Sequence, residues 1–211
     1  MNRRHLKALL PAAAVAVSLG LAGCGSSMED HDMGSMATPA ASSSPAGPAA
    51  SATPAAGPHN DADVMFATMM IPHHLQAIEM SDLLLAKTGV DPKVTDLATR
   101  IKATQGPEVD QMNGWLAGWG ANPSASEMGG MDHGNDDGMM SQADMDALKT
   151  ADGEQAAKLF LTGMVKHHQG AVQMAQTELD EGSNPDAKKL AQAIITAQNT
   201  EIAEMNKLLA G

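Results

Sequence analysis

The chain has 211 residues, of which 25 are acidic and 13 basic, and its formal net charge is −12. This acidic balance makes nucleic acid an unfavourable partner. Because Cys24 is its single cysteine, the chain can form neither an internal disulfide nor a zinc or iron–sulfur site that is built on cysteines.

The first segment of the chain has the features of an export signal. A basic stretch at residues 1–7 precedes an apolar run, Ala8 to Ala22, that is too short to span a bilayer. The run leads into Leu-Ala-Gly-Cys24, which resembles the lipobox of bacterial lipoproteins, where the cysteine is lipidated and becomes the new N-terminus. We therefore expect residues 1–23 to be a lipoprotein signal peptide. Cys24 would then anchor the exported protein to the cell membrane, facing the periplasm or the cell exterior.

Two further regions follow the signal peptide. Residues 24–59 consist mainly of Ala, Ser, Pro and Gly, with almost nothing large and apolar to bury, and we expect them to form a disordered tether. Residues 60–211 are enough for one domain with a core. After loss of the signal peptide the chain keeps 10 basic and 25 acidic residues, a formal charge of −15.

Helical punctuation occurs twice in this domain. Gly89 followed by Asp91-Pro92 is typical of a helix stop, an N-cap and a first-turn proline, and Gly182 followed by Asn184-Pro185 repeats it about 93 residues later. No segment alternates in polarity as a strand would. We predict a short additional helix that opens at Ser141 and four main helices, at residues 61–87, 92–119, 153–181 and 185–210.

Each half of the domain is therefore predicted to be a helical hairpin with one apolar stripe. The second helix of each hairpin carries its seam positions at the same 4,3,4,4,3 spacing, which is typical of a helix bundle. Two such hairpins bury their stripes best against each other, so we predict an all-α, four-helix bundle with pseudo-twofold symmetry. Residues 121–140, between the halves, are rich in Gly, Asp and Met and are expected to form a loop.

A motif with adjacent histidines among methionines occurs once in each half. The first copy runs from Phe66 to Met80 and the second from Phe160 to Met174. Positions seven apart share a helix face, so the first histidine of each pair lies on the core stripe and the second borders it. The candidate metal ligands are Met70, His73, His74 and Met80 in the first copy, and Met164, His167, His168 and Met174 in the second.

The second helix of each hairpin places an amide and a carboxylate at the height of the histidines, because the helical rise is equal on both sides of the turn. A carboxylate that accepts a hydrogen bond from an imidazole fixes its tautomer and orientation, as around metal sites. A methionine follows one turn further along, and it joins the glutamate in the candidate site. These residues are Gln105, Glu108 and Met112 opposite His73, and Gln198, Glu201 and Met205 opposite His167.

The number of histidines indicates a function. A lone histidine on an apolar stripe is usually a core residue, and a row of methionines is usually adaptable packing. Four histidines in two copies change this balance, because burying so many polar groups is unfavourable unless they pair or bind something. Imidazole and thioether ligands together suit copper, as Cu(I) and also as Cu(II).

Two Gly- and Asp-rich stretches, at residues 28–36 and 128–140, also carry methionine and histidine. Methionine has no packing reason to be enriched in such segments, whereas thioethers are good ligands for Cu(I). We interpret the second stretch as a copper-collecting loop. Its candidate ligands are Met128, Met131, His133, Met139 and Met140.

The repeated pattern Phe-x3-Met-x2-His-His-x2-Ala-x2-Met, with Ile-x3-Gln-x2-Glu-x3-Met-Asn downstream in each half, resembles the CopM-like family of secreted bacterial proteins, domain of unknown function 305. The resemblance covers roughly residues 61–211. It implies a ferritin-like four-helical fold and periplasmic or extracellular copper binding in metal resistance. Asp63, three positions before the motif phenylalanine, fits the family pattern, whereas Ala157 replaces the acid in the second half, so the two sites are expected to differ in affinity.

Three hypotheses of function follow. The first is an exported, lipid-anchored protein that sequesters or buffers copper, with other copper-handling envelope proteins as candidate partners. The second is a ferritin-like metal-dependent oxidase, but such bundles pair a glutamate with a histidine three residues later. Here Glu108 is followed by Gln111, and Glu201 by Glu204. We therefore expect no enzymatic activity. The third is a metal-free interaction module on the envelope, in which the histidines are structural.

Overall fold

The computed structural model describes residues 57–121 and 138–211, which belong to one compact unit. These residues form five helices and no strand. The first main helix ends two residues earlier than predicted, and the other three main helices have the predicted bounds. The helices are α1 (Asp61–Leu85), α2 (Pro92–Trp119), α4 (Gln142–Thr150), α5 (Gly153–Glu181) and α6 (Pro185–Ala210).

Each helix begins where a polar side chain can bind the free backbone N–H groups of the first turn. Asn60 and Ser141 start α1 and α4 with complete capping boxes. The predicted punctuation is confirmed for α2 and α6, where a capping side chain precedes a proline in the first turn. None of the helices in the described part of the chain is long and apolar enough to cross a membrane.

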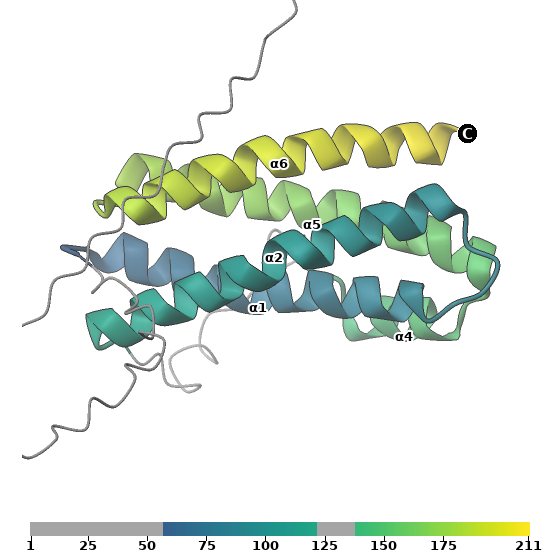
Figure 1. Ribbon diagram of the computed structural model, residues 1–211, viewed down its shortest axis with the longest axis horizontal. Helices are drawn as coiled ribbons and strands as arrows, with labels where there is room; N and C mark the ends of the chain where they lie inside the picture. The colour runs from purple at the N-terminus through teal and green to yellow at the C-terminus, as the bar shows by residue number, and fades with distance from the viewer. Residues whose placement is uncertain (1–56, 122–137) are drawn as a thin grey trace, which may run out of the picture. The chain divides into compact units, whose positions relative to one another are not determined.

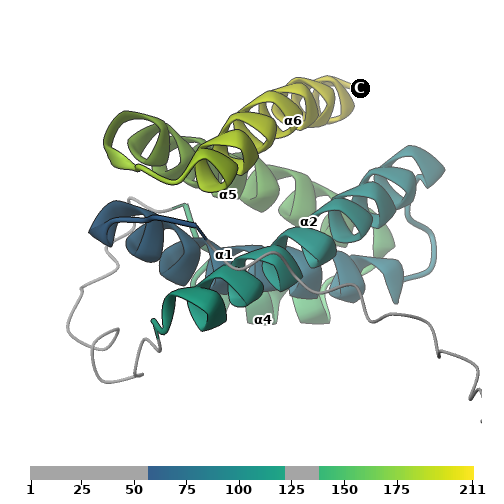
Figure 2. The ribbon, with the colours of Figure 1, turned by 60° about the vertical axis from the view of Figure 1, so that its left-hand side comes forward.

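The helices form two antiparallel hairpins, α1 with α2 and α5 with α6 (Figure 1). The hairpins pack mainly through α1 and α5, and Figure 2 shows the hairpin of α5 and α6 above the hairpin of α1 and α2. Contact between α2 and α6 is slight and includes an exposed ion pair between Arg100 and Glu204, 2.6 Å from Nη2 to Oε1. The short helix α4 packs against α1 and α5.

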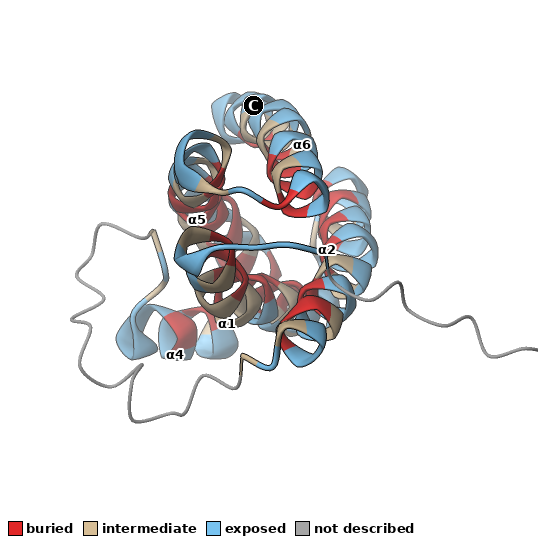
Figure 3. Ribbon diagram, turned by 90° about the vertical axis from the view of Figure 1, so that its left-hand side faces the viewer, coloured by how far each residue is buried: buried red, intermediate tan, exposed pale blue. Residues whose placement is uncertain are grey.

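The buried faces of the four long helices turn toward one another (Figure 3). They form two hydrophobic clusters, one containing Phe66 and Trp115 and the other containing Phe160 and Leu148. The second cluster includes buried residues of α4, whereas the first does not. The predicted all-α fold of two duplicated hairpins in a four-helix bundle is thus confirmed.

Candidate metal centre

Four buried histidines form a polar layer between the two hydrophobic clusters. His73 is 1% exposed, and His74, His167 and His168 are not exposed at all. We call these four residues the histidine layer. They come from the middle of α1 and α5, the two helices that hold the hairpins together. The sequence motif therefore places all four imidazoles inside the bundle.

One histidine of each pair binds a glutamate across its own hairpin. His74 Nε2 lies 2.8 Å from Glu108 Oε2, and His168 Nε2 lies 2.8 Å from Glu201 Oε2. The glutamates are the ones that were predicted, but the sequence argument placed them opposite His73 and His167. That detail was wrong, because adjacent residues of a helix point about 100° apart and the second histidine of each pair is the one that faces the partner helix.

The other histidine of each pair faces the opposite hairpin. The rings of His73 and His167 are in contact, with centroids 3.7 Å apart and planes tilted by 35°. Burial lowers the pKa of His167 well below 6.5, and the nearby His73, His168 and His74 lower it further. His167 is therefore neutral at physiological pH, which is the form that binds metals.

Several polar atoms of this region are buried without a hydrogen-bond partner in the described part of the chain: Nδ1 of His74 and His168, both ring nitrogens of His167, and side-chain atoms of Gln105 and Gln198. Each such atom destabilises the fold by about 1–3 kcal/mol. A carboxylate accepts its hydrogen bond from a protonated Nε2, which leaves Nδ1 with a lone pair. His74 and His168 thus carry a donor atom that is suited to a metal ion.

Methionines lie on both sides of the histidine layer. Met70 and Met112 belong to the cluster of Phe66, whereas Met80, Met164 and Met205 belong to the cluster of Phe160, and all five are fully buried. Met174, the last motif methionine, is only partly buried and packs at the edge of the first cluster. Imidazoles with thioethers nearby fit copper, and the glutamates fit as groups that orient the rings.

The described residues contain no group of three or more His, Cys, Asp or Glu side chains that is arranged to hold a metal ion. The methionines beside the histidine layer offer thioether ligands in addition to its imidazoles. Methionine adapts readily, because it is unbranched and flexible. Imidazole and thioether ligands favour a soft ion over an ion that demands carboxylates and high coordination.

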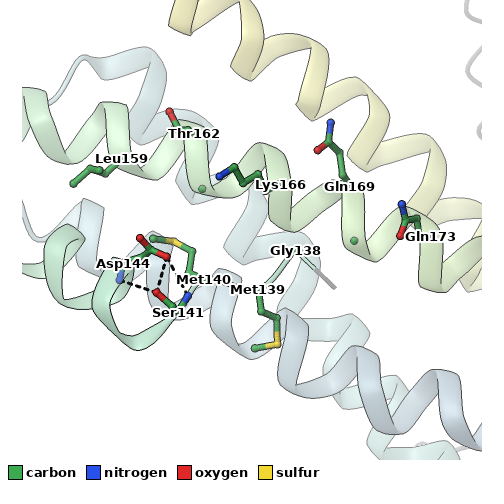
Figure 4. A pocket seen from close by; sticks show the side chains of 12 residues that line it. Gly138, Met139, Met140, Ser141, Asp144, Leu159, Thr162, Lys166, Gln169 and Gln173 are labelled. Carbon is green, nitrogen blue, oxygen red and sulfur yellow. Dashed lines mark hydrogen bonds between the residues drawn. The ribbon is translucent and has the colours of Figure 1, made fainter. Parts of the chain in front are cut away.

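The end of the predicted copper-collecting loop packs on the bundle. The Met140 backbone makes two hydrogen bonds with the Gln76 side chain, 2.8 and 3.0 Å long. Its sulfur covers Gly163, where an added Cβ would lie only 2.7 Å from Sδ. Figure 4 shows Met140 and Met139 at the edge of a pocket beside α5. The other predicted ligands of the loop, Met128, Met131 and His133, lie outside the described residues, as does Cys24.

A buried carboxyl pair at the end of the bundle was not predicted. Asp63 accepts hydrogen bonds from the backbone of Asn60, Ser183 and Asn184 and from the Ser183 hydroxyl. Burial alone would raise the pKa of Asp63, but these bonds and Glu178 hold it below its ordinary value. Burial, with Asp63 as neighbour, raises the pKa of Glu178 to about 8. The acid at position 63 was the only signal in the sequence.

Comparisons with known proteins agree with this picture. Residues 63–209 match the family described as "Domain of unknown function (DUF305)". The structure is similar to that of a DUF305 fragment from Deinococcus radiodurans, with 33% identity, a TM-score of 0.65 and coverage of 73% of this chain and 99% of the other. A DUF305 protein from Streptomyces coelicolor, named as a secreted-protein candidate, gives 36% identity, a TM-score of 0.63 and coverage of 71% and 91%.

A third similar structure is CopM in its Cu(I)-bound form, with 31% identity, a TM-score of 0.57 and coverage of 69% of this chain and 94% of CopM. CopM also matches in its Cu(II)-bound, silver-bound and apo forms. An uncharacterized protein of Acanthamoeba polyphaga mimivirus is 40% identical over 52 residues, which are 25% of this chain and 34% of that protein. The family resemblance that was inferred from the motifs is confirmed.

Proposed function

The chain belongs to the DUF305 family, and from this premise we propose that it is an exported copper-binding protein that sequesters or buffers Cu(I) and Cu(II). The similarity to CopM, which has been solved in Cu(I)-bound, Cu(II)-bound and silver-bound forms, supports a copper-related role. The proposed ligands are the histidine layer and the methionines beside it.

The observation that carries this proposal is the pair of matched His–Glu contacts at the centre of the bundle. Both contacts measure 2.8 Å, and both leave the histidine Nδ1 buried without a hydrogen-bond partner among the described residues. A structural role alone would favour pairing both nitrogens or replacing the histidines by apolar residues. Imidazoles that are oriented by carboxylates and keep a free ring nitrogen are instead suited to bind a metal ion.

Export by the N-terminal signal and anchoring through a lipid on Cys24 are part of the same proposal. They rest on the basic and apolar segments before Leu-Ala-Gly-Cys24. The secreted-protein designation of the Streptomyces coelicolor relative supports export. An anchored copper-binding protein would hold the metal outside the cytoplasm and pass it to other copper-handling envelope proteins.

We further propose that the protein is not an oxidase. A ferritin-like di-metal centre uses glutamates from two helices together with Glu-x2-His pairs from the other two. Glu108 and Glu201 each form a hydrogen bond with a histidine of the neighbouring helix, and neither has a histidine three positions later in the sequence. The bundle therefore supplies imidazoles and thioethers, a set that suits binding of copper more than oxidation chemistry at a carboxylate-bridged pair of metal ions.

The test is an anaerobic titration of the mature chain with Cu(I) against a competing chelator, with native mass spectrometry to count the bound ions. A variant in which all four residues of the histidine layer are replaced with glutamine should bind fewer copper ions per chain at pH 7. The difference from the unchanged protein gives the number of ions that the histidines hold. A His59→Gln control should bind as the unchanged protein does, because His59 is exposed and stacks on Trp119 away from the layer. Full copper stoichiometry in the quadruple variant at pH 7 would refute the proposal.

The single variants Glu108→Gln and Glu201→Gln keep the test decisive if the quadruple variant does not fold by circular dichroism. Each leaves every histidine in place but weakens the carboxylate that orients one ring. Loss of such an orienting group typically lowers metal affinity by roughly 10-fold to 100-fold. Unchanged Cu(I) affinity in both variants would show that the His–Glu pairs serve the fold alone.

A further inference from the structure

A groove between the start of α1 and the end of α5 brings together three methionines that the histidine layer does not use. Its cavity volume is about 410 Å³. We call it the methionine groove. It is lined by Met65, Met69, Met174 and Glu178, together with Asp61, Ala62, Phe66, Thr177 and Glu181.

The antiparallel packing of α1 and α5 explains why these residues meet. The start of α1 lies beside the end of α5, as the hydrogen bond from Asn60 Nδ2 to the Glu181 carbonyl oxygen shows. Met65 and Met69 are four residues apart and share one helix face. Met174 lies two helical turns beyond His167, so the groove is separate from the histidine layer. The sequence grouped Met174 with the histidines, whereas the structure places it in the methionine groove.

The other end of the α1–α5 pair contains the counterpart of this groove, but it is covered. Because Phe66 and Phe160 are 94 positions apart, Met69 corresponds to Gly163 and Glu178 to Leu84. There the Met140 side chain lies over Gly163, and Leu84 is fully buried in the cluster that includes residues of α4. In the methionine groove no helix of the described residues takes the place of α4, and Met65 is 48% exposed.

Glu178 is a buried acidic residue among those that line the groove. The residue is only 1% exposed, and no N–H or hydroxyl group of the described residues donates a hydrogen bond to either oxygen of its carboxyl group. Its polar neighbour is the carboxyl of Asp63. An ionised carboxylate that is buried in this way is strongly unfavourable unless it gains a proton or a cation.

Gly182 allows this carboxyl to occupy its position. A Cβ at residue 182 would lie 2.2 Å from Glu178 Oε1. The φ angle of Gly182 is −66°, which any residue can adopt, so the glycine is needed here for space and not for backbone conformation. The close approach of Glu178 is therefore built into the turn before α6.

We propose that the methionine groove is a second metal-binding site, which takes a soft monovalent cation of the Cu(I) or Ag(I) class on the thioethers of Met65, Met69 and Met174. Thioethers are uncharged, do not titrate, and prefer soft ions. The site is open to solvent at Met65, so it can load without disturbing the buried histidines.

The test uses Ag(I), which is diamagnetic and redox-inert, with the mature chain labelled at the methionine methyl carbons with ¹³C. In NMR spectra recorded during titration, the methyl signals of the three groove methionines should shift together within the first equivalents of Ag(I). Replacing all three with leucine, which preserves volume and the fold, should reduce the number of bound Ag(I) ions by one in native mass spectrometry. The control Met145→Leu changes a methionine of α4 that packs in the cluster of Phe160, outside the groove, and should leave the groove signals unchanged.

Two results would overturn the inference. The first is saturation with Ag(I) while the three groove signals remain at their original positions. The second is an unchanged Ag(I) stoichiometry in the triple leucine variant. Failure of the histidine sites is distinguishable, because glutamine replacements in the histidine layer would then leave copper binding unchanged while the groove signals still respond to Ag(I).

Discussion

The buried carboxyl of Glu178 makes folding stability depend on pH, and Glu178→Gln should remove that dependence. The pKa of Glu178 is raised from 4.5 to about 8, by burial first and then by its contact with Asp63, against a smaller opposing effect of Lys188. Between these values the folded protein retains a proton that the unfolded chain releases. Stability must therefore fall as the pH rises from about 5 to about 8.

The size of the effect follows from the two pKa values. At pH 7 the unfolded side chain is almost fully ionised, whereas the folded one is mostly protonated. The difference amounts to at most about 3 kcal/mol of lost stability relative to pH 4. Glutamine resembles the protonated acid in shape and can donate to Asp63. We expect Glu178→Gln to be nearly neutral at pH 5 and to stabilise the fold by roughly 1–3 kcal/mol at pH 8.

Urea unfolding followed by circular dichroism at pH 5, 6, 7 and 8 measures this difference directly. Glu181→Gln is the matched control, because it removes the same charge three residues later on α5 from an exposed side chain. Its stability should follow the same pH course as the unchanged protein. Equal pH slopes in both variants, or a less stable Glu178→Gln variant at pH 8, would refute the argument.

Four further outcomes are expected. Because the pKa of His167 is lowered in the fold, the free energy of unfolding should also fall as the pH drops below about 6.5. Urea unfolding of His167→Gln should show a weaker fall, and an equal fall would contradict the lowered pKa of His167. Deleting residues 127–140 should remove the loop's share of the Cu(I) binding that survives at pH 4, measured by chelator competition, because thioethers do not titrate. The share of the methionine groove at pH 4 and the binding by the histidine layer at pH 7 should persist. Cys24→Ala should release the protein from the membrane fraction, and fractionation like the native protein would exclude the lipid anchor. Fe(II) mixed with the purified protein should oxidise no faster than in buffer, and sustained turnover that Glu108→Ala abolishes would favour an oxidase.

Much of the fold was predictable because its signals are local. The caps at Asp91 and Asn184 and the prolines after them fix where α2 and α6 begin, and equal helical rise from those turns places Glu108 and Glu201 at the height of the histidines. The glutamates could therefore be identified without a structure. Which histidine of each pair they bind depends on the rotation of a helix about its axis, and periodicity does not determine this within one residue.

Contacts between the hairpins could not be predicted in the same way. Periodicity shows that α1 and α5 have apolar faces, but it does not set how one slides along the other. The contact between His73 and His167 depends on that register. The burial of the equivalent methionines Met80 and Met174 depends on this register too. Met80 is covered where α4 packs, whereas Met174 lines an open groove. Gly182 ends α5 as predicted, but the sequence did not show that this position must also leave room for the Glu178 carboxyl.

The two halves differ at their ends and agree at their centre. The His74–Glu108 and His168–Glu201 pairs have the same 2.8 Å separation, and their glutamates are exposed to nearly the same extent, 14% and 15%. A difference in copper affinity between the halves, which the replacement of the acid by Ala157 predicts, therefore has no source in these pairs. Its source must lie in the surroundings of the motif methionines, because Asp63 and Glu178 border one end of the α1–α5 pair, whereas Met140 covers the other. Exchanging Glu178 with its counterpart Leu84 would change the surroundings of the motif methionines without altering either His–Glu pair. The contributions of the His–Glu pairs and of the methionine surroundings to copper affinity can therefore be measured independently.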